Sequence, residues 1–142
     1  MNVKDILDEK GRDVVTIGEN ASVSDVIAQL ADKKIGATIV ATDDNRILGI
    51  ISERDIVRVL SAHGAGALDM AVSLVMTRKV LVCSESHSID HVMETMTNGR
   101  FRHLPIEEEG RLAGLVSIGD VVRKRIEQVE REAEQMKSYI SG

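Results

Sequence analysis

The residues best suited to chemistry in this chain belong to one motif that occurs twice. It appears as Gly49–Asp55 (GIISERD) and as Gly114–Asp120 (GLVSIGD). A serine followed three residues later by an acid predicts a capping box at the start of a helix. The same groups can bind a ligand, because helix amides and a hydroxyl suit a phosphate, while a carboxylate accepts hydrogen bonds from a ribose diol. For either copy alone, capping is the favoured interpretation.

The two copies differ in the residue before the aspartate. Arg54 precedes Asp55, whereas Gly119 precedes Asp120. A cation in the first turn opposes the helix dipole and is tolerated best when an anion lies nearby, which favours a ligand site in the first copy. The second half has a cationic pair of its own, Arg102–His103, although a solvated strand edge explains that pair equally well. We therefore expect two sites that are not equivalent.

The elements that must position these motifs also repeat. An amphipathic helix is expected at 23–30 and again, 66 residues later, at 89–96. Ser22 and Ser88 stand just before these helices as N-cap candidates. The apolar stripes consist of Val23, Val26, Ile27 and Leu30 and of Ile89, Val92, Met93 and Met96.

Short apolar segments around these helices are predicted strands. They lie at 14–17, 38–41 and 47–51 in the first half and at 80–83, 103–106 and 112–116 in the second. A second helix follows the last strand of each half, so each half is predicted to be a β-α-β-β-α unit. One such sheet has an uncovered face, so we expect the two units to pack as one folded body with pseudo-twofold symmetry.

The fold class is therefore mixed α and β (α+β), with two repeats and a C-terminal helical extension. The predicted boundaries are 1–62 for the first repeat, 63–69 for a Gly- and Ala-rich linker, 70–125 for the second repeat and 126–142 for an amphipathic helix. Lead-in turns are expected at 3–7 and at 70–76.

Composition argues against several classes of partner. The net charge of −5 and the two aromatic residues, Phe101 and Tyr139, leave neither a basic surface nor a stacking platform for nucleic acid. No uncharged stretch approaches the roughly 20 residues that span a bilayer. The single cysteine, Cys83, forbids an internal disulfide and is consistent with a reducing compartment. We expect a cytoplasmic protein that binds neither nucleic acid nor membranes.

No pattern in the sequence predicts catalysis. A nucleophile with recognisable His and acid partners is absent, as is a P-loop. Cys83, His87 and His91 stand four residues apart, as metal ligands can, but His87 precedes the expected helix cap and no fourth ligand is evident. We predict no metal site and no enzyme, and a metal-dependent enzyme built on these residues is the least favoured alternative.

The last helix carries an apolar stripe with heptad spacing. The stripe can pack on the surface of its own module or against a second chain, and the two interpretations are equally good. Its members are Val122, Ile126, Val129, Ala133, Met136 and Ile140.

The repeat, the two GhhSxxD motifs and the RHLPI segment at 102–106 together resemble a tandem cystathionine-β-synthase (CBS) domain pair, over essentially residues 1–125. The resemblance implies a non-catalytic regulatory module without an obligatory cofactor, which binds AMP, ADP, ATP, NAD(H) or S-adenosylmethionine in clefts between the units and signals to a regulated partner protein. It also implies a homodimer. The alternative is a structural homodimerisation module without a ligand.

The resemblance further implies ligand-binding residues in both repeats. They are Asp55 and Asp120 for the ribose, Ser52, Arg54 and Ser117 on the phosphate side, Arg102 and His103 for phosphate across the cleft, Ala37, Thr38 and Leu104 beside the adenine, and Thr16 at a variable strand position whose counterpart is taken to be Cys83. Because the two sets differ at Arg54 and Thr16, one site is expected to fill first.

Overall fold

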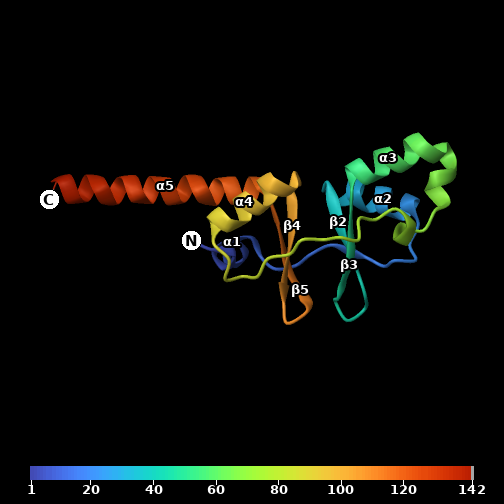
Figure 1. Cartoon of the computed structure of the whole chain (residues 1–142), viewed down its shortest axis with the longest axis horizontal. Helices are drawn as coiled ribbons and strands as arrows, with labels where there is room; N and C mark the ends of the chain where they lie inside the picture. Colours follow the sequence, from blue (N-terminus) through green and yellow to red (C-terminus); the bar gives the residue numbers. More distant parts are fainter. Residues whose placement is uncertain (142) are drawn as a thin grey trace. The chain divides into compact units, whose positions relative to one another are not determined.

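The structure is a computed structural model that describes residues 1–141 (Figure 1). It contains two sets of elements, and in each set a helix is followed by two strands and a second helix. In chain order the elements are α1 (Val3–Lys10), β1 (Thr16–Ile17), α2 (Val23–Lys33), β2 (Ala37–Ala41), β3 (Ile47–Ser52), α3 (Glu53–His63), the 3₁₀ helices η1 (Gly64–Asp69) and η2 (Val72–Leu74), α4 (Ile89–Gly99), β4 (His103–Glu108), β5 (Arg111–Ser117) and α5 (Ile118–Ser141). The predicted mixed α and β fold with two repeats is confirmed.

The chain divides into two compact units, each with a hydrophobic core of its own. The first-repeat unit contains residues 13–81 and 109–112, and the second-repeat unit contains residues 1–12, 82–108 and 113–141. Each unit is described below by itself.

The sheet of the first-repeat unit has the order β1-β2-β3. β1 pairs parallel to β2 and β2 pairs antiparallel to β3, as expected for a β-α-β-β connection. All five residues of β2 are buried. Ser22 caps α2 by accepting a hydrogen bond from the N–H of Asp25, and Val23 and Val26 point from this helix into the core. The capping role predicted for Ser22 is confirmed.

The sheet of the second-repeat unit has only two strands, β4 and β5. The strand predicted at 80–83 is wrong, because only Cys83 pairs there, in a single parallel bridge with Ile106. The N–H of Cys83 donates to the carbonyl of Pro105, and its carbonyl accepts from the N–H of Glu107. Extending the ladder toward residue 81 would need a backbone donor at Pro105, which proline lacks.

The same bridge corrects one correspondence between the repeats. Ile17 pairs with Val40 in the first-repeat unit, and Cys83 pairs with Ile106 in the second. Each residue of the second pair lies 66 positions after its equivalent in the first pair. Cys83 is therefore the counterpart of Ile17 and not, as predicted, of Thr16.

The N-terminal segment is a helix, not the lead-in turn that was predicted at 3–7. Asn2 and Asp5 form a capping box that starts α1. Val3 and Leu7 are fully buried in the core of the second-repeat unit, with α4 and β4 residues such as Val92. Although the segment precedes the first repeat in sequence, its packing partners belong to the second.

The segment expected to be a linker folds as the 3₁₀ helix η1. Ala67 in η1 is fully buried among the core residues of the first-repeat unit. The following segment also packs, because the N–H of Val23 donates to the carbonyl of Met70 and Val72 is buried in η2. Small residues in this stretch thus allow close packing.

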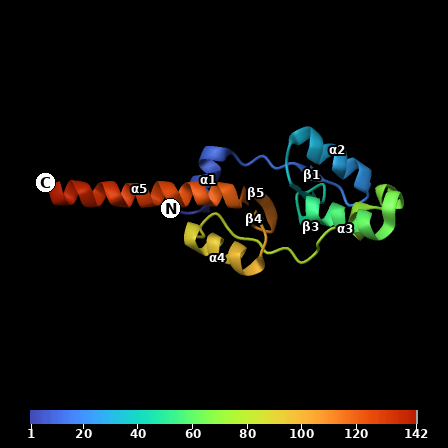
Figure 2. The ribbon, with the colours of Figure 1, turned by 90° about the horizontal axis from the view of Figure 1, so that it is seen from above.

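The final helix of the second repeat and the predicted C-terminal extension form one continuous helix, α5. Its first turns pack with α4 and α1, and its C-terminal part extends beyond both (Figures 1 and 2). The apolar stripe remains exposed from Val122 to Ile140, so packing of the stripe on its own unit is not observed. Among the described helices, none combines the length and apolar character needed to cross a membrane.

Candidate functional site

The first GhhSxxD motif places its serine and aspartate at the junction between β3 and α3. Ser52 is the N-cap, and its N–H donates to Oδ2 of Asp55 over 2.9 Å. The N–H of Asp55 points back to Oγ of Ser52 at 3.4 Å. The capping interpretation of this copy is therefore confirmed.

Asp55 has further partners on its other oxygen. Oδ1 accepts from the hydroxyl of Thr77 at 3.3 Å and from the guanidinium of Arg58 at 3.4 Å. The residue is only 6% exposed. Both oxygens are thus engaged by the protein itself, so a ligand hydroxyl would have to replace one of these donors.

The second motif makes the same reciprocal contacts where β5 runs into α5. The N–H of Ser117 donates to Oδ2 of Asp120 over 2.8 Å, and the N–H of Asp120 donates to Oγ of Ser117 over 3.2 Å. The same kind of box starts α1 and α2, where no ligand role was predicted. A capping box alone therefore does not indicate a binding site. The residues that surround each box must show which of the boxes can bind a ligand.

Asp120 differs from Asp55 in its charged partners. Nζ of Lys10 lies 2.5 Å from Oδ2 of Asp120, and the guanidinium of Arg123 lies 2.8 Å from Oδ1. Burial alone would raise the pKa of Asp120, but the hydrogen bonds from Lys10 and Ser117 outweigh it and hold the pKa below its ordinary value. Asp120 is therefore a carboxylate acceptor at neutral pH.

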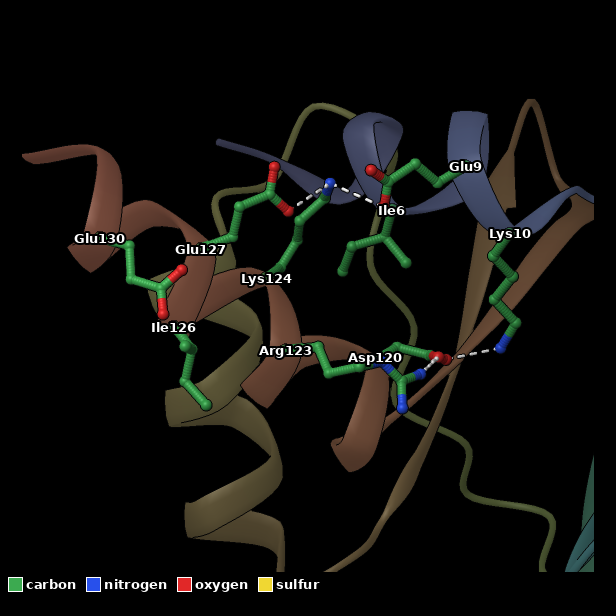
Figure 3. Close-up of a pocket in the computed structure, with 9 residues that line it drawn as sticks. All are labelled: Ile6, Glu9, Lys10, Asp120, Arg123, Lys124, Ile126, Glu127 and Glu130. Atoms are coloured by element: carbon green, nitrogen blue, oxygen red, sulfur yellow. Dashed lines mark hydrogen bonds and ion pairs between the residues drawn. The ribbon is translucent and has the colours of Figure 1, made fainter. Parts of the chain in front are cut away.

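A cavity of about 480 Å³ opens beside Asp120 in the second-repeat unit (Figure 3). Its walls come from α1 and α5 and include Lys10, Arg123 and Lys124. Lys124 is buried, and its Nζ contacts Glu9 of α1 at 2.9 Å and Glu127 of α5 at 3.1 Å. Lys10 and Arg123 contact Asp120 from the solvent side, and their side chains are 38% and 75% exposed. Three cations and four acids line the cavity, and the two cations that contact Asp120, Lys10 and Arg123, have side chains that solvent can reach.

Three residues predicted to border the adenine are buried within their own units. Ala37 and Thr38 lie in β2, and Leu104 lies in β4, with exposures of 2% or less. The hydroxyl of Thr38 donates to the carbonyl of Val15 over 2.8 Å, which ties β2 to the chain before β1. In the described structure these side chains act in the cores.

The remaining predicted residues lie closer to the surface. Arg54 is exposed in the first turn of α3, Arg102 is exposed before β4, and Thr16 and His103 are half-buried. The carbonyl of Arg102 accepts from the N–H of Ile118, which fixes the start of α5 beside the start of β4.

Lys10, Lys124 and Glu9 were missed by sequence reasoning. Lys10 and Asp120 are 110 positions apart, and no local pattern indicates that α1 packs against α5. A basic residue in the last turn of α1 was the only available signal, and it has an ordinary explanation in the helix dipole.

A second group of side chains comes together at the N-terminus of α4. Ligand atoms of Cys83, His87 and His91 all lie within 4.8 Å of one another. Burial raises the pKa of the Cys83 thiol above its ordinary value, so the free side chain is a neutral thiol. His87 precedes the cap residue Ser88, as predicted. The loop nevertheless folds back, so that the ring of His87 stacks on the ring of His91.

Both repeats match the family model of the CBS domain, at residues 3–62 and 71–127. The chain therefore belongs to the CBS-domain family, whose members are regulatory proteins.

Similar proteins include CBS-domain proteins from several organisms. The mitochondrial CBS domain-containing protein CBSX3 of Arabidopsis thaliana is 27% identical over 99% of this chain and 72% of its own length. The crystal structure of a CBS-domain containing protein from Agrobacterium tumefaciens is 50% identical, with a TM-score of 0.83 over 87% of this chain and 92% of its own. The CBS domain pair of protein MJ0100, solved in complex with 5′-methylthioadenosine and S-adenosyl-L-methionine, is 25% identical, with a TM-score of 0.77 over 87% of this chain and 98% of its own.

Proposed function

We propose that this protein is a non-catalytic sensor that binds an adenine-containing nucleotide at the Ser117–Asp120 end of its second-repeat unit. The observation that carries the proposal is the carboxylate of Asp120 at a helix N-terminus, beside a cavity of about 480 Å³ and in contact with the solvent-exposed cations Lys10 and Arg123. Small-molecule sites in proteins commonly have volumes of about 300–1,000 Å³. Asp120 would accept hydrogen bonds from the ribose diol, and Lys10 and Arg123 would bind phosphate.

The ligand class rests on the family and on one relative. Protein MJ0100 was solved with two ligands that share an adenosine moiety, 5′-methylthioadenosine and S-adenosyl-L-methionine. AMP, ADP, ATP and NAD(H) contain the same moiety and add phosphates, which would meet the side chains of Lys10 and Arg123 beside Asp120. We therefore propose a nucleotide with at least one phosphate as the preferred ligand.

The two motifs are proposed to differ in affinity. Sequence alone favours the first copy because of Arg54, whereas the local geometry favours the second. Both side chains are largely buried, at 7% exposed for Asp55 and 10% for Asp120. Asp55 accepts four hydrogen bonds from its own unit, whereas Asp120 accepts three, and two of its three donors are the side chains of Lys10 and Arg123, which are 38% and 75% exposed. Arg54, Arg102 and His103 remain proposed phosphate contacts.

A signalling route follows from the contact that a ligand would displace. Lys10 belongs to α1 and Asp120 to α5, so their ion pair joins the two helices. A phosphate that attracts Lys10, together with a ribose that takes the carboxylate, would replace this pair and change the packing of α1 on α5. A regulated protein that prefers one arrangement would respond to the ligand. We also propose that the protein acts in the cytoplasm, in keeping with its single cysteine.

Calorimetric titration with AMP, ATP, NADH and S-adenosylmethionine tests the site. For the ligand that binds, we expect Asp120→Asn to weaken affinity by about tenfold or more, since a charge-assisted hydrogen bond contributes roughly 1.5–3 kcal/mol. Asp25→Asn is the matched control, because Asp25 makes the same reciprocal capping contacts in α2. Equal affinities for the wild-type protein and Asp120→Asn would contradict the site, and folded protein that binds none of the four ligands would favour a structural role.

We also propose that the protein forms a homodimer through the stripe on α5. The stripe residues Val122, Ile126 and Val129 are 40%, 53% and 47% exposed, and Met136 and Ile140 are 65% and 79% exposed. Their alternating spacing of three and four residues fits the a and d positions of a two-stranded coiled coil. A second copy of the chain presents the same stripe and is the proposed occupant.

The charges beside the stripe favour a parallel pair. Arg125 and Glu132 fall at g positions, and Glu130 and Lys137, five residues later in each case, fall at e positions. In a parallel dimer Arg125 faces Glu130 of the partner subunit, and Glu132 faces Lys137 of the partner subunit, so both contacts are attractive. An antiparallel pair centred on the same stretch would bring Glu130 against Glu130 of the partner subunit.

Light scattering coupled to gel filtration tests the dimer. Met136→Asp places a charge in the seam and is expected to raise the dimer dissociation constant at least about tenfold. Ser138→Asp, on the opposite face of the same turn, is expected to leave the constant unchanged. A Met136→Asp protein as dimeric as the wild type would exclude α5 as the interface.

Cysteine cross-linking tests the parallel arrangement. In a parallel dimer the two copies of residue 140 face each other, so Ile140→Cys is expected to cross-link on oxidation. A dimeric Ile140→Cys protein that does not cross-link would exclude the parallel arrangement.

A further inference from the structure

Cys83, His87 and His91 have the chemistry of a zinc site, and they are separate from the residues proposed to bind a nucleotide. Their ligand atoms lie within 4.8 Å of one another. Zinc binds thiolate sulfur at about 2.3 Å and imidazole nitrogen at about 2.0–2.1 Å, so ligand atoms around a tetrahedral ion are roughly 3.5 Å apart. Movements of about 1 Å in the side chains would therefore close the cluster around an ion.

The sulfur ligand comes from a rigid part of the unit. Cys83 is 3% exposed, and its backbone bonds on both sides to β4, at 3.2 Å to Pro105 and at 2.9 Å to Glu107. His91 lies in the first turn of α4, where its N–H donates to the cap residue Ser88 over 3.0 Å. The sheet and the helix thus hold two of the three ligands at fixed positions.

The third ligand lies in the loop between them. The His87 and His91 rings stack with centroids 4.5 Å apart and an interplanar angle of 15°. Nδ1 of His87 accepts from the N–H of Ser84 over 2.8 Å and lies 3.1 Å from the Ser84 hydroxyl. If Nε2 of His87 binds an ion, the ring proton moves to Nδ1. Nδ1 then no longer accepts the hydrogen bond from the N–H of Ser84 and donates instead to the Ser84 hydroxyl. A hydrogen bond from the second ring nitrogen is usual for histidine ligands of metals.

We propose that Cys83, His87 and His91 form a binding site for Zn²⁺. A thiolate with two imidazoles selects a borderline-soft ion over Mg²⁺ or Ca²⁺, which prefer oxygen ligands. Binding releases the thiol proton of Cys83 to solvent. Since His91 is exposed, the fourth position of a tetrahedral ion faces solvent and would hold water or a small solute.

The position of the loop indicates what the ion would do. The carbonyl of His87 accepts from the N–H of Val3, and the carbonyl of Glu85 accepts from the N–H of Lys4, both over 3.0 Å. The loop that would bind the ion therefore holds the N-terminus of α1. Zinc would stabilise this attachment in the folded state.

Cobalt and zinc titrations of the full chain, purified without a histidine tag and dialysed against chelator, test the site. We expect one Co²⁺ per chain, a near-ultraviolet thiolate-to-cobalt charge-transfer band, and displacement of Co²⁺ by Zn²⁺. His91→Ala should weaken Zn²⁺ binding by about tenfold or more, and Cys83→Ser should abolish the charge-transfer band. His63→Ala, an exposed histidine of the first-repeat unit, is the control and should change neither.

Two outcomes would overturn the proposal. One is a wild-type protein that binds Co²⁺ without a charge-transfer band, and the other is His91→Ala binding zinc as tightly as the wild type. Because His91 is exposed, this variant is expected to fold even if Cys83→Ser does not. Nucleotide titration of the same His91→Ala protein separates this proposal from the Asp120 site, which should be unaffected.

Discussion

Replacing Leu7 with alanine is expected to lower the free energy of unfolding by about 2–5 kcal/mol, the usual range for truncating a large buried side chain. Leu7 is fully buried in α1, and it packs in the core of the second-repeat unit. Its methyl groups fill the space that the absent side chain of Gly114 leaves open, since a Cβ there would lie 2.8 Å from them. Alanine would leave a cavity between α1 and β5 that neither backbone can easily close.

Urea unfolding followed by far-ultraviolet circular dichroism measures this loss. Leu74→Ala is the matched control, because Leu74 is 72% exposed and its truncation should change stability by less than about 0.5 kcal/mol. A loss below about 1 kcal/mol for Leu7→Ala would show that α1 contributes little to the second-repeat core. The same variant should bind nucleotide more weakly if Lys10 acts from α1 as proposed.

Local sequence patterns predicted the features that depend on neighbouring residues. Ser22, Ser88 and both GhhSxxD serines act as helix caps because capping needs only a hydroxyl and an amide three residues later. The repeat of the apolar stripes predicted α2 and α4, since a helix buries one face whatever it packs against. Which of the predicted ligand residues touch a nucleotide remains a prediction.

Features that depend on distant residues were not predictable in this way. The sequence predicts a turn where α1 forms a helix with a capping box, because no apolar repeat extends this segment and its partner α5 is more than 100 residues away. The bridge at Cys83 stays short because of Pro105, a residue in another strand. In each case the deciding contact joins segments whose proximity only the tertiary fold establishes.

Gly49→Ala is expected to destabilise the first-repeat unit by about 1–3 kcal/mol, the usual cost of overpacking a site that cannot relax. A Cβ at Gly49 would lie 2.8 Å from both the carbonyl oxygen of Thr77 and the sulfur of Met76. Thr77 cannot move away freely, because its backbone exchanges two hydrogen bonds with Ile50, at 3.0 and 2.8 Å. Its hydroxyl also donates to Asp55 over 3.3 Å, so displacement would loosen one partner of that carboxylate.

Two other glycines separate overpacking from the general effect of adding a methyl group. Gly18→Ala meets no atom within 4 Å and should be neutral or slightly stabilising, because alanine restricts the unfolded chain. Gly114→Ala meets only the flexible end of Leu7, so it should cost less than Gly49→Ala, whose neighbour is backbone. Thermal unfolding of the three variants measures the order. If Gly49→Ala were as stable as Gly18→Ala, the segment at 76–77 would be able to shift, and Thr77 could not be the contact that holds Asp55 in place.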